Sequence, residues 1–518
     1  MHTLHHKKSS TQPTRHFRQH LLASVLAILT LSTTATVYAM PTETEERRAT
    51  EVDTSQPIVA IDKLDSLKQN EPLHMTLPDI QHFTTDNGVP VAFVRTDELP
   101  MVDISLRFNA GSARDNAIRP DGFGIANMTA TMLSQGTKNL NEDEFATATE
   151  QLGINLGAGA YKDMFVISLR SLSDDAHLEP ALALFADMLQ NPVFDENILQ
   201  RNKAQLMLGL QQQQQNPSNV ASKAFIQALY GDHPYAHPSS GTLETVPSIS
   251  QTDLQQFWQK FLVARNANIA ITGNLTEQQA KQIANQLTSI LPQGEPAPAL
   301  PEPKPRTSAE RIDIPFDSTQ TTVMIGQLGN TRTRDPQQMQ EQTNFAIGNH
   351  ILAGGDFNAR LMTEIRKNRG YTYGISGGMS PMQAKGPYLI SFSTRNDKAE
   401  DAINATLETI EQTLQTGVDD KEVTLTKDNL TNSFPMSFAS NASINAMLGM
   451  MGFYQLPDSY LTEYVQRIEN SNTNTVNQSL RSTLTPENFL IVTVGQPSAS
   501  NGNNDSNNKD SGDNRDKE

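Results

Sequence analysis

Hydrophobic residues follow two different periods along the chain, and segments of one period are interleaved with segments of the other. An alternating pattern, which is typical of strands that bury one face, occurs over residues 102–108, 164–169 and 388–392. Apolar residues at helical spacing occur over residues 143–152, 178–189 and 401–413. Because strands and helices alternate in both halves of the chain, the pattern predicts an α+β protein with a duplicated domain.

The middle of the chain contains a proline-rich stretch, residues 292–307, which includes the sequence PAPALPEPKP. Proline can neither continue a helix nor donate to a sheet, so this stretch predicts an extended linker. The sequences on either side echo each other: VDISLRFNAGSAR from residue 102 resembles VMIGQLGNTRTR from residue 323, and NIAITG from residue 268 resembles FLIVTVG from residue 489. We therefore expect two related domains, residues 78–291 and 308–496.

The first 39 residues have the order of a secretory signal peptide. A basic lead is followed by an apolar run over residues 21–31 and by small residues up to Ala39. A membrane anchor, the competing interpretation, needs about 20 apolar residues, and polar residues 32–34 interrupt this run. We expect cleavage after Ala39, a periplasmic or secreted location, and no membrane-spanning segment. Polar composition predicts an extended N-terminal segment over residues 40–77 and a disordered tail over residues 497–518.

Acidic residues outnumber basic ones, with 57 Asp and Glu against 40 Lys and Arg and a net charge of -17. Removal of the predicted signal, which contains four of the basic residues, leaves 36 - 57 = -21. Such a charge repels phosphate backbones, so we expect no nucleic-acid partner and favour a cationic or neutral peptide. The absence of cysteine excludes disulfides, thiol nucleophiles and cysteine-bound metals. Any metal site would need His, Asp or Glu.

The most informative segment is residues 122–138, GFGIANMTATMLSQGTK. Four apolar residues at helical spacing predict a buried stripe: Ile125, Met128, Met132 and Leu133. The stripe leaves Asn127, Ala130 and Thr131 on a neighbouring face of the same helix.

This segment resembles the zinc-site helix of the insulinase/pitrilysin family, the inverzincins, close to its mitochondrial-processing-peptidase-like bacterial branch. In that family the helix carries H-x-x-E-H ahead of Met-Leu and Gly-Thr-Lys sequences like those found here. Two imidazoles one turn apart hold zinc, and the Glu between them acts as general base. The resemblance aligns these three positions with Asn127, Ala130 and Thr131, so neither a metal ligand nor a base remains.

The family's third zinc ligand is a Glu on a helix roughly 75 residues further along, and residues 198–243 contain no Glu. The acidic residue in that interval is Asp232, in the loop GDHPYAHP. His233 and His237 in this loop have metal-ligand spacing, but Pro234 and Pro238 argue against a helix there, so we favour a structural turn. The sequence therefore predicts no metal in this chain.

A second feature of the family occurs over residues 354–374, GGDFNARLMTEIRKNRGYTYG. The pattern predicts a helix over residues 358–369 that ends at Gly370 and is followed by a strand. Residues 360–373 resemble the family element R-L-x-x-x-L-R-x-x-x-G-x-x-Y. The resemblance implies that Arg366 and Tyr373 reach a zinc site, hold substrate and polarise its carbonyl. The structural interpretation is a charge at a helix end and a half-buried strand tyrosine.

Small residues also alternate over residues 153–161, GINLGAGAY, which predicts a strand that an extended peptide can approach closely. Gly157 and Gly159 are the candidate substrate-binding positions. The alternative is a strand that glycine weakens at a bend.

The resemblance covers about residues 78–496. It implies two homologous metallopeptidase-like α/β half-domains, each a mixed sheet covered by helices, which face each other as a clamshell.

In this branch, peptidases often work as pairs of related chains. One chain has H-x-x-E-H, and the other lacks the ligands but keeps the Arg/Tyr corner. This chain fits the second type, so the resemblance implies a non-catalytic subunit of a heteromeric zinc endopeptidase, with zinc in an H-x-x-E-H-bearing partner. The alternative is a stand-alone peptide-binding or assembly protein.

Overall fold

The computed structural model describes residues 77–355 and 357–496. The predicted signal peptide, residues 40–76 of the predicted N-terminal segment and the whole predicted tail, residues 497–518, lie outside the described residues. In the part of the chain that the structure describes, no helix is both long and apolar enough to cross a bilayer. The cleavage site and the location of the protein stay predictions.

The N-terminal half, residues 78–291, contains a six-stranded mixed sheet in the order β1-β2-β6-β3-β5-β4. Its strands are β1 (Gln81–Thr84), β2 (Pro90–Arg95), β3 (Met101–Phe108), β4 (Asn155–Ala160), β5 (Phe165–Leu172) and β6 (Ala267–Gly273). The β2 and β6 strands are parallel, and the other neighbours are antiparallel. The two strands that alternation predicted in this half are β3 and β5.

The C-terminal half, residues 308–496, contains a five-stranded sheet in the order β7-β11-β8-β10-β9. Its strands are β7 (Glu310–Pro315), β8 (Gln320–Leu328), β9 (Thr372–Met379), β10 (Pro387–Arg395) and β11 (Leu490–Gly495). Only the β7–β11 pair is parallel. The order matches β2-β6-β3-β5-β4 strand for strand, and the two sequence echoes fall on β3 with β8 and on β6 with β11. The predicted duplicated α+β fold is confirmed.

The helices of the N-terminal half are α1 (Ile125–Leu133), α2 (Glu142–Leu152), α3 (Asp175–Gln190), α4 (Glu196–Gln213), α5 (Pro217–Tyr230), α6 (Gln251–Phe261) and α7 (Glu277–Ser289). Those of the C-terminal half are α8 (Pro336–Asn349), α9 (Ala399–Thr416), α10 (Asp420–Ser433), α11 (Asn441–Tyr454), α12 (Ser459–Thr462), α13 (Tyr464–Asn470) and α14 (Thr473–Thr483). The three helices predicted from apolar spacing are α2, α3 and α9.

Shorter helical segments connect these elements. Two are π-helices, η6 (His350–Gly354) and η7 (Met362–Asn368). The others are 3₁₀ turns: η2 (Ser112–Ala117), η3 (Pro234–Ala236), η4 (Val246–Ser248), η5 (Ala264–Asn266), η8 (Asn396–Lys398), η9 (Phe434–Phe438) and η10 (Pro486–Asn488).

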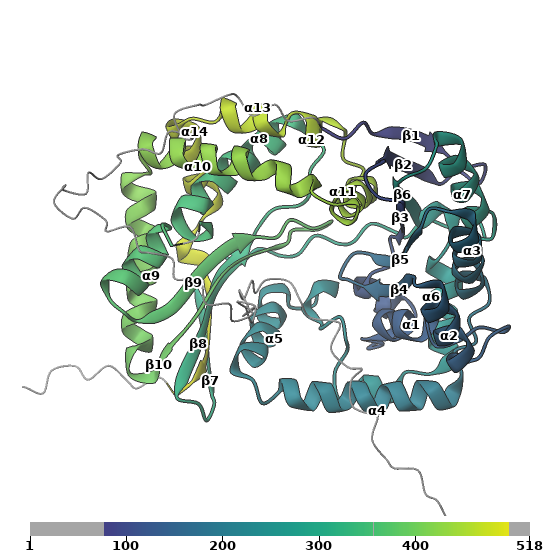
Figure 1. Ribbon diagram of the computed structural model, residues 1–518. Helices are drawn as coiled ribbons and strands as arrows, with labels where there is room; N and C mark the ends of the chain where they lie inside the picture. The colour runs from purple at the N-terminus through teal and green to yellow at the C-terminus, as the bar shows by residue number, and fades with distance from the viewer. Residues whose placement is uncertain (1–76, 356, 497–518) are drawn as a thin grey trace, which may run out of the picture. The chain divides into compact units, whose positions relative to one another are not determined.

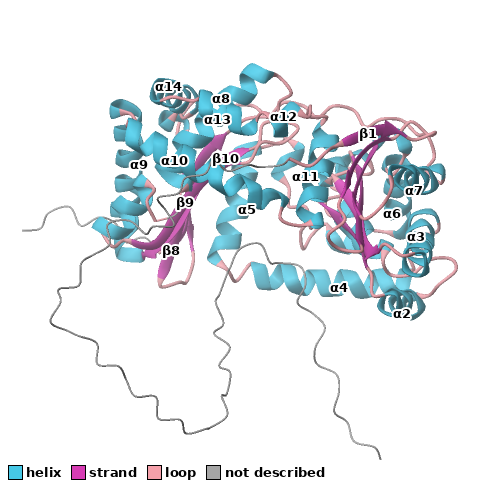
Figure 2. Ribbon diagram, turned by 45° about the horizontal axis from the view of Figure 1, so that its top comes forward, coloured by secondary structure: helices cyan, strands magenta, loops and turns pink. Residues whose placement is uncertain are grey.

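Each sheet is covered on one face by helices of its own half and receives one helix from the other half. Figure 2 shows α3, α6 and α7 on one side of the N-terminal sheet and α11 on the other, where α11 contacts β2, β3 and β6. In return, α5 packs on β8 and β11 of the C-terminal sheet, with α9 on the opposite side (Figure 1). The two halves therefore complete each other's cores.

Polar side chains fix α11 on the N-terminal sheet. The Asn445 amide donates to the carbonyl oxygens of Asp103 and Ala270, at 2.9 Å each, and accepts from the Ser105 hydroxyl at 2.5 Å. Beside it, the Arg107 side chain, which is 8% exposed, occupies the space next to Gly449. A methyl group added to Gly449 would lie 1.2 Å from Nη1 of the Arg107 guanidinium. Glycine at this point of α11 is what allows the helix to sit over a buried arginine.

A buried carboxylate joins further segments of the two halves. Asp163, 3% exposed, accepts from the Tyr235 hydroxyl, from the Gln383 backbone N–H at 2.9 Å and from the Tyr454 hydroxyl at 3.0 Å. Burial and the neighbouring Asp163 charge raise the pKa of Tyr235 and of Tyr454, so both phenols remain protonated donors. The turn after β4, the loop that contains η3, the β9–β10 connection and α11 meet at this carboxylate.

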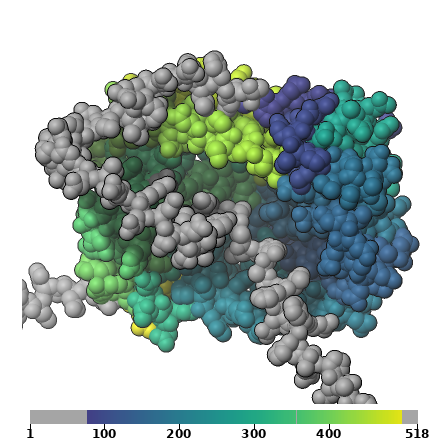
Figure 3. All heavy atoms as spheres, viewed as in Figure 1, coloured from purple at the N-terminus to yellow at the C-terminus, as the bar shows by residue number. Residues whose placement is uncertain are grey.

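The first strand also contacts the C-terminal half. His82 on β1 lies 2.8 Å from the Asp458 carboxylate, and Ile80 packs with Phe434 and Met451. In the space-filling view, the purple atoms at the start of the described chain adjoin the yellow-green atoms of this region (Figure 3).

The proline-rich stretch, residues 292–307, contains neither helix nor strand. It is attached to the N-terminal half, because the Pro292 carbonyl accepts from Ala264 N–H, Ala297 N–H donates to the Asn266 side chain, and the Pro301 carbonyl lies 2.8 Å from His233 Nε2. This geometry is compatible with an extended connection, and the predicted domain boundaries remain predictions.

Two glycine-to-alanine substitutions should have opposite effects on stability. Alanine normally stabilises a helix interior by about 0.5–1 kcal/mol relative to glycine, and Gly209→Ala in α4 should do so because no atom lies within 4 Å of the new methyl group. Gly449→Ala in α11 should instead lower the free energy of unfolding by about 1–3 kcal/mol, because Arg107 must move within a packed interior. Urea unfolding of both variants measures this. A stabilising Gly449→Ala would contradict the described seating of α11.

Candidate functional site

The helix α1, which resembles a zinc-site helix, is anchored at its start by a buried aspartate. Asp115 is 1% exposed, and its two carboxylate oxygens accept from the backbone N–H groups of Gly124 at 2.8 Å and Ala126 at 2.9 Å. Burial raises the pKa of Asp115 to about 7, although these hydrogen bonds act in the opposite direction. Gly124 has a φ of 100°, a left-handed conformation that glycine adopts without strain.

The predicted stripe of α1 is buried: Ile125, Met128, Met132 and Leu133 are all in the core of the N-terminal half. Asn127 is half-buried and Thr131 is exposed, with the Thr131 hydroxyl donating to the Asn127 carbonyl at 3.1 Å. Ala130, 3% exposed, packs into the core, although it lies on the same neighbouring face as Asn127 and Thr131. A methyl group is short enough to be covered by its neighbours.

The third position of a zinc site would lie on α4, which packs against α1. About 75 residues beyond Thr131, α4 carries Leu206 and Met207, which pack on the core and have no metal-binding oxygen or nitrogen in their side chains. Where the helices approach, the Asn202 side chain lies 3.4 Å from the Met132 sulfur. Among the described residues, no group of three or more His, Asp or Glu side chains is arranged to hold a metal.

The two loop histidines have structural roles. His233 is buried, its Nδ1 accepts from the Tyr235 N–H at 3.1 Å, and its Nε2 contacts the Pro301 carbonyl at 2.8 Å. His237 stacks on Phe123 with ring centroids 3.4 Å apart. Burial lowers the pKa of both imidazoles. This geometry agrees with the structural turn predicted for the loop.

The glycine-rich segment forms β4, an edge strand that pairs with β5 on one side and contacts α1. A Cβ built on Gly157 would have no atom within 4 Å, and one on Gly159 would meet only the Tyr161 ring, at 3.9 Å. The backbone of β4 is therefore approachable along the side that does not pair with β5, next to the helix that carries Asn127 and Thr131.

The helix predicted over residues 358–369 differs from expectation in its form. Its regular part is the π-helix η7, and the N–H of Arg369, the residue that follows η7, donates to the Glu364 carbonyl five residues earlier. This i to i−5 bond is longer by one residue than the i to i−4 bond of an α-helix, and π-helical turns occur frequently at functional sites. Over two turns, the apolar pattern of a π-helix is too similar to that of an α-helix for the sequence to distinguish them. Gly370, with φ 64°, follows the helix as predicted.

Arg366 lies within η7, and Tyr373 lies on β9 (Thr372–Met379). The Arg366 guanidinium carbon is 4.6 Å from the centroid of the Phe357 ring, which is itself exposed. Tyr373 is 88% exposed at the start of the edge strand β9, so it is not the half-buried residue of the structural interpretation. The Thr372 hydroxyl donates to the Ser393 carbonyl at 2.7 Å, which points Thr372 inward and the next side chain outward.

An ion pair fixes the helix that precedes Tyr373. Arg360 Nε and Nη2 lie 2.8 and 2.6 Å from the two Glu422 carboxylate oxygens, which ties the start of the helix to α10. Sequence comparison with the family gave Arg360 no separate role, and nothing in the spacing pointed to Glu422 as its partner. Within the described residues, no hydrogen bond, ion pair or ring contact joins Arg366 or Tyr373 to Asn127, Ala130 or Thr131.

Comparison with known proteins relates both halves to one peptidase family. Residues 91–243 match the profile described as insulinase (peptidase family M16), and residues 248–430 match the profile described as the peptidase M16 inactive domain. A solved structure of a peptidase M16 inactive domain from Pseudomonas fluorescens is 38% identical, with a TM-score of 0.76, over 81% of this chain and 98% of that one.

Two curated bacterial proteins extend the comparison. The uncharacterized zinc protease YmxG of Bacillus subtilis is 23% identical over 417 residues, which are 80% of this chain and 98% of that protein. A Helicobacter pylori protein described as the non-peptidase homolog YmxG is 27% identical over 289 residues, 55% of this chain and 64% of its own length. Similar chains are thus described both as proteases and as a protein without that activity.

The first functional prediction is that the untagged protein retains no stoichiometric zinc. A catalytic zinc normally has three protein ligands, and the corresponding positions carry Asn127, Thr131 and an apolar segment of α4. Metal analysis after dialysis, followed by titration with zinc against a chromogenic chelator, measures retention and affinity. One tightly held zinc per chain would contradict the expected loss of the metal site.

Proposed function

This chain belongs to the M16 (insulinase) family of peptidases, and we propose that it is a non-catalytic subunit of a heteromeric zinc endopeptidase. In this proposal, an H-x-x-E-H-bearing chain supplies the zinc and the general base. The present chain supplies Arg366 and Tyr373, which bind substrate and stabilise the transition state at the partner's metal. The observation that carries the proposal is the combination of an exposed Tyr373 on an edge strand with an α1 helix that lacks metal ligands.

The chemistry of the two side chains supports this assignment. Attack of water on a peptide carbonyl creates an oxyanion, and a phenol and a guanidinium are hydrogen-bond donors suited to stabilise it. Tyr373 is free of neighbouring packing, and Arg366 extends over the Phe357 ring on the same surface segment. Such exposure suits a residue that acts on a reacting carbonyl at another chain's metal.

The peptide is proposed to lie along β4. Main-chain hydrogen bonds to an edge strand hold an extended peptide without demanding a particular sequence, and the space beside Gly157 and Gly159 permits the approach. Peptide binding here is common to the complementing subunit and to the alternative function, a stand-alone peptide-binding or assembly protein. The exposed Tyr373 favours the first of these.

Export is part of the proposal. The order of the first 39 residues, basic then apolar then small, supports a periplasmic or secreted protein, with the partner chain exported alongside it. Peptide degradation or processing outside the cytoplasm would be the resulting activity. N-terminal sequencing of the mature protein from cell fractions tests this, and a chain that keeps its first residues in the cytoplasm would contradict it.

Peptide binding along β4 can be tested by adding side chains. Gly157→Val and Gly159→Val should weaken the binding of an extended peptide about tenfold, because the new side chains interfere with strand pairing that contributes about 1 kcal/mol per hydrogen bond. Fluorescence anisotropy with labelled β-forming peptides measures affinity, and circular dichroism checks folding. Gly378→Val, at an equally open position on β9, is the matched control. Equal affinities in all variants would leave β4 as a purely structural strand.

Complementation tests the function itself. Mixing this chain with an H-x-x-E-H chain from the same organism should give peptidase activity that neither has alone. Tyr373→Phe and Arg366→Ala should each lower turnover on the order of 100-fold while changing substrate affinity less, because the lost interaction forms in the transition state.

Lys367→Ala is the control for Arg366→Ala, since it removes a neighbouring exposed cation. Light scattering on each mixture measures how much complex forms. Activity that is proportional to the amount of complex would indicate a structural role for Arg366 and Tyr373. Well-formed complexes with full activity in both variants would reject the catalytic role and favour the stand-alone peptide-binding protein.

A further inference from the structure

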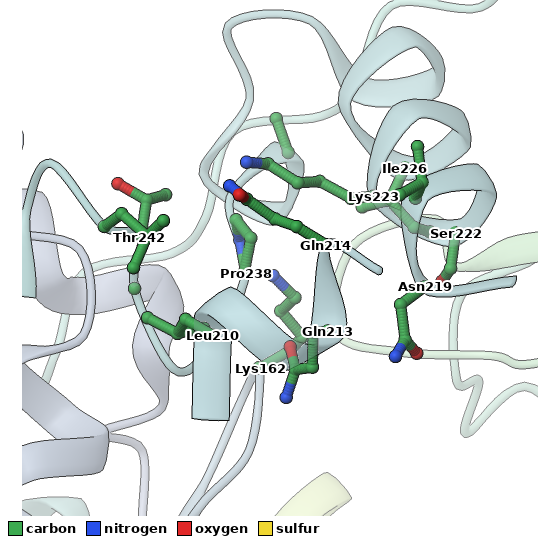
Figure 4. Close-up of a pocket in the computed structure, with 14 residues that line it drawn as sticks. Lys162, Leu210, Gln213, Gln214, Asn219, Ser222, Lys223, Ile226, Pro238 and Thr242 are labelled. Atoms are coloured by element: carbon green, nitrogen blue, oxygen red, sulfur yellow. The ribbon is translucent and has the colours of Figure 1, made fainter. Parts of the chain in front are cut away.

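A pocket of about 290 Å³ lies next to the end of β4 and combines cationic, amide and hydroxyl groups. Figure 4 shows it between the last turn of α4, the first turns of α5 and the loop with Pro238 and Thr242. Its polar lining includes Lys162, Lys223, Gln213, Gln214, Asn219 and Thr242. Leu210 and Ile226 are among its apolar walls. None of the described residues that line it is an Asp or a Glu.

The pocket connects the proposed peptide strand with the altered zinc-site helix. Lys162 is in the turn that follows β4, so a peptide paired with β4 extends toward it. The loop on the other side is fixed to the start of α1, where the Thr245 hydroxyl donates to the Phe123 carbonyl at 2.9 Å and His237 stacks on Phe123. A side chain or chain end of that peptide can therefore enter the pocket.

The carboxylates near the pocket only partly neutralise its two lysine ammonium groups, those of Lys162 and Lys223. Lys162 Nζ donates to the His237 carbonyl, which accounts for one of its three protons. Burial lowers its pKa to about 8, against the attraction of Asp115 and Asp163. Burial raises the pKa of Asp115, which weakens this carboxylate as a counter-charge for Lys162. Asp163 is engaged by two tyrosines and lies near Arg114.

Lys223 is exposed on α5, and the exposed Glu244 is an acidic neighbour of it. The Glu244 pKa is lowered first by its hydrogen bond to Thr242, and the Lys223 charge contributes least. The Lys223 ammonium thus remains available to a ligand.

We propose that this pocket binds a carboxylate of the peptide held on β4, either an Asp or Glu side chain or the C-terminal carboxylate. Lys223 supplies a charge-assisted hydrogen bond at the opening, Lys162 adds positive potential inside, and the amides of α4 and α5 offer further donors. The apolar walls accept the methylene groups that precede the carboxylate. This preference for a carboxylate rests on the proposed peptide-binding function and specifies the class of peptide that would be bound.

The test uses the full chain without a partner and a set of labelled alanine–valine peptides in which one Glu, Gln or Lys is moved along the sequence. At one position, Glu should bind about tenfold tighter than Gln, and Lys should bind weaker than Gln. A second set compares free and amidated C-termini. A preference at an internal position identifies a side-chain carboxylate, and a preference only for the free terminus identifies the chain end.

Lys223→Gln should remove most of the preference, and because this side chain is exposed the fold should remain intact. Lys421→Gln on α10 makes the same charge change on an exposed site of the other half and should retain the preference. Equal binding of Glu and Gln peptides with equal binding of free and amidated termini would overturn the proposal, as would no peptide binding or a preference that Lys223→Gln leaves intact. Complementation with an H-x-x-E-H chain is measured separately, so failure of the pocket and failure of the subunit role are distinguishable.

Discussion

The carboxylate of Asp163 is the interaction on which the arrangement of the two halves depends. A buried charge is costly unless donors surround it, and here the donors come from distant parts of the chain: Tyr235 in the first half, and Gln383 and Tyr454 in the second. The turn that holds Asp163 directly follows β4 and also contains Lys162. The contact that joins the halves therefore also fixes the end of the proposed peptide strand and one wall of the proposed carboxylate pocket.

Much of the fold was predictable because it repeats. Alternation gave β3, β5 and β10, and two weak echoes located strands that occupy matching places in two sheets. The exchange of α5 and α11 was not predictable, because an amphipathic helix shows that one face is covered without showing which sheet covers it. The local sequence around Asn445 and Gly449 does not indicate their structural roles. These roles depend on contacts with Ser105 and Arg107, which lie far away in the sequence.

The candidate site was predictable to a different extent in each half. Missing ligands could be found by aligning α1 with a family motif, because metal sites depend on few residue types at fixed spacing. The exposure of Tyr373, the π-helical form of η7 and the stacking of Arg366 on Phe357 needed coordinates, since they depend on backbone hydrogen bonds that side-chain patterns do not encode. Likewise, Lys162 and Lys223 are 61 positions apart in the numbering and share a pocket only after folding.

The reciprocal exchange of α5 and α11 has a consequence for how the chain reaches its native state. Ala92, Val94 and Ala270 of the N-terminal sheet are covered by Ile444 and Leu448, which follow them by about 170 residues or more. An emerging chain therefore exposes this apolar sheet face until α11 has been synthesised. Contacts of such large sequence separation slow folding and leave partly folded chains open to aggregation. Because each half buries an apolar sheet face against a helix of the other, truncation after the linker should yield an aggregation-prone fragment rather than a smaller native domain.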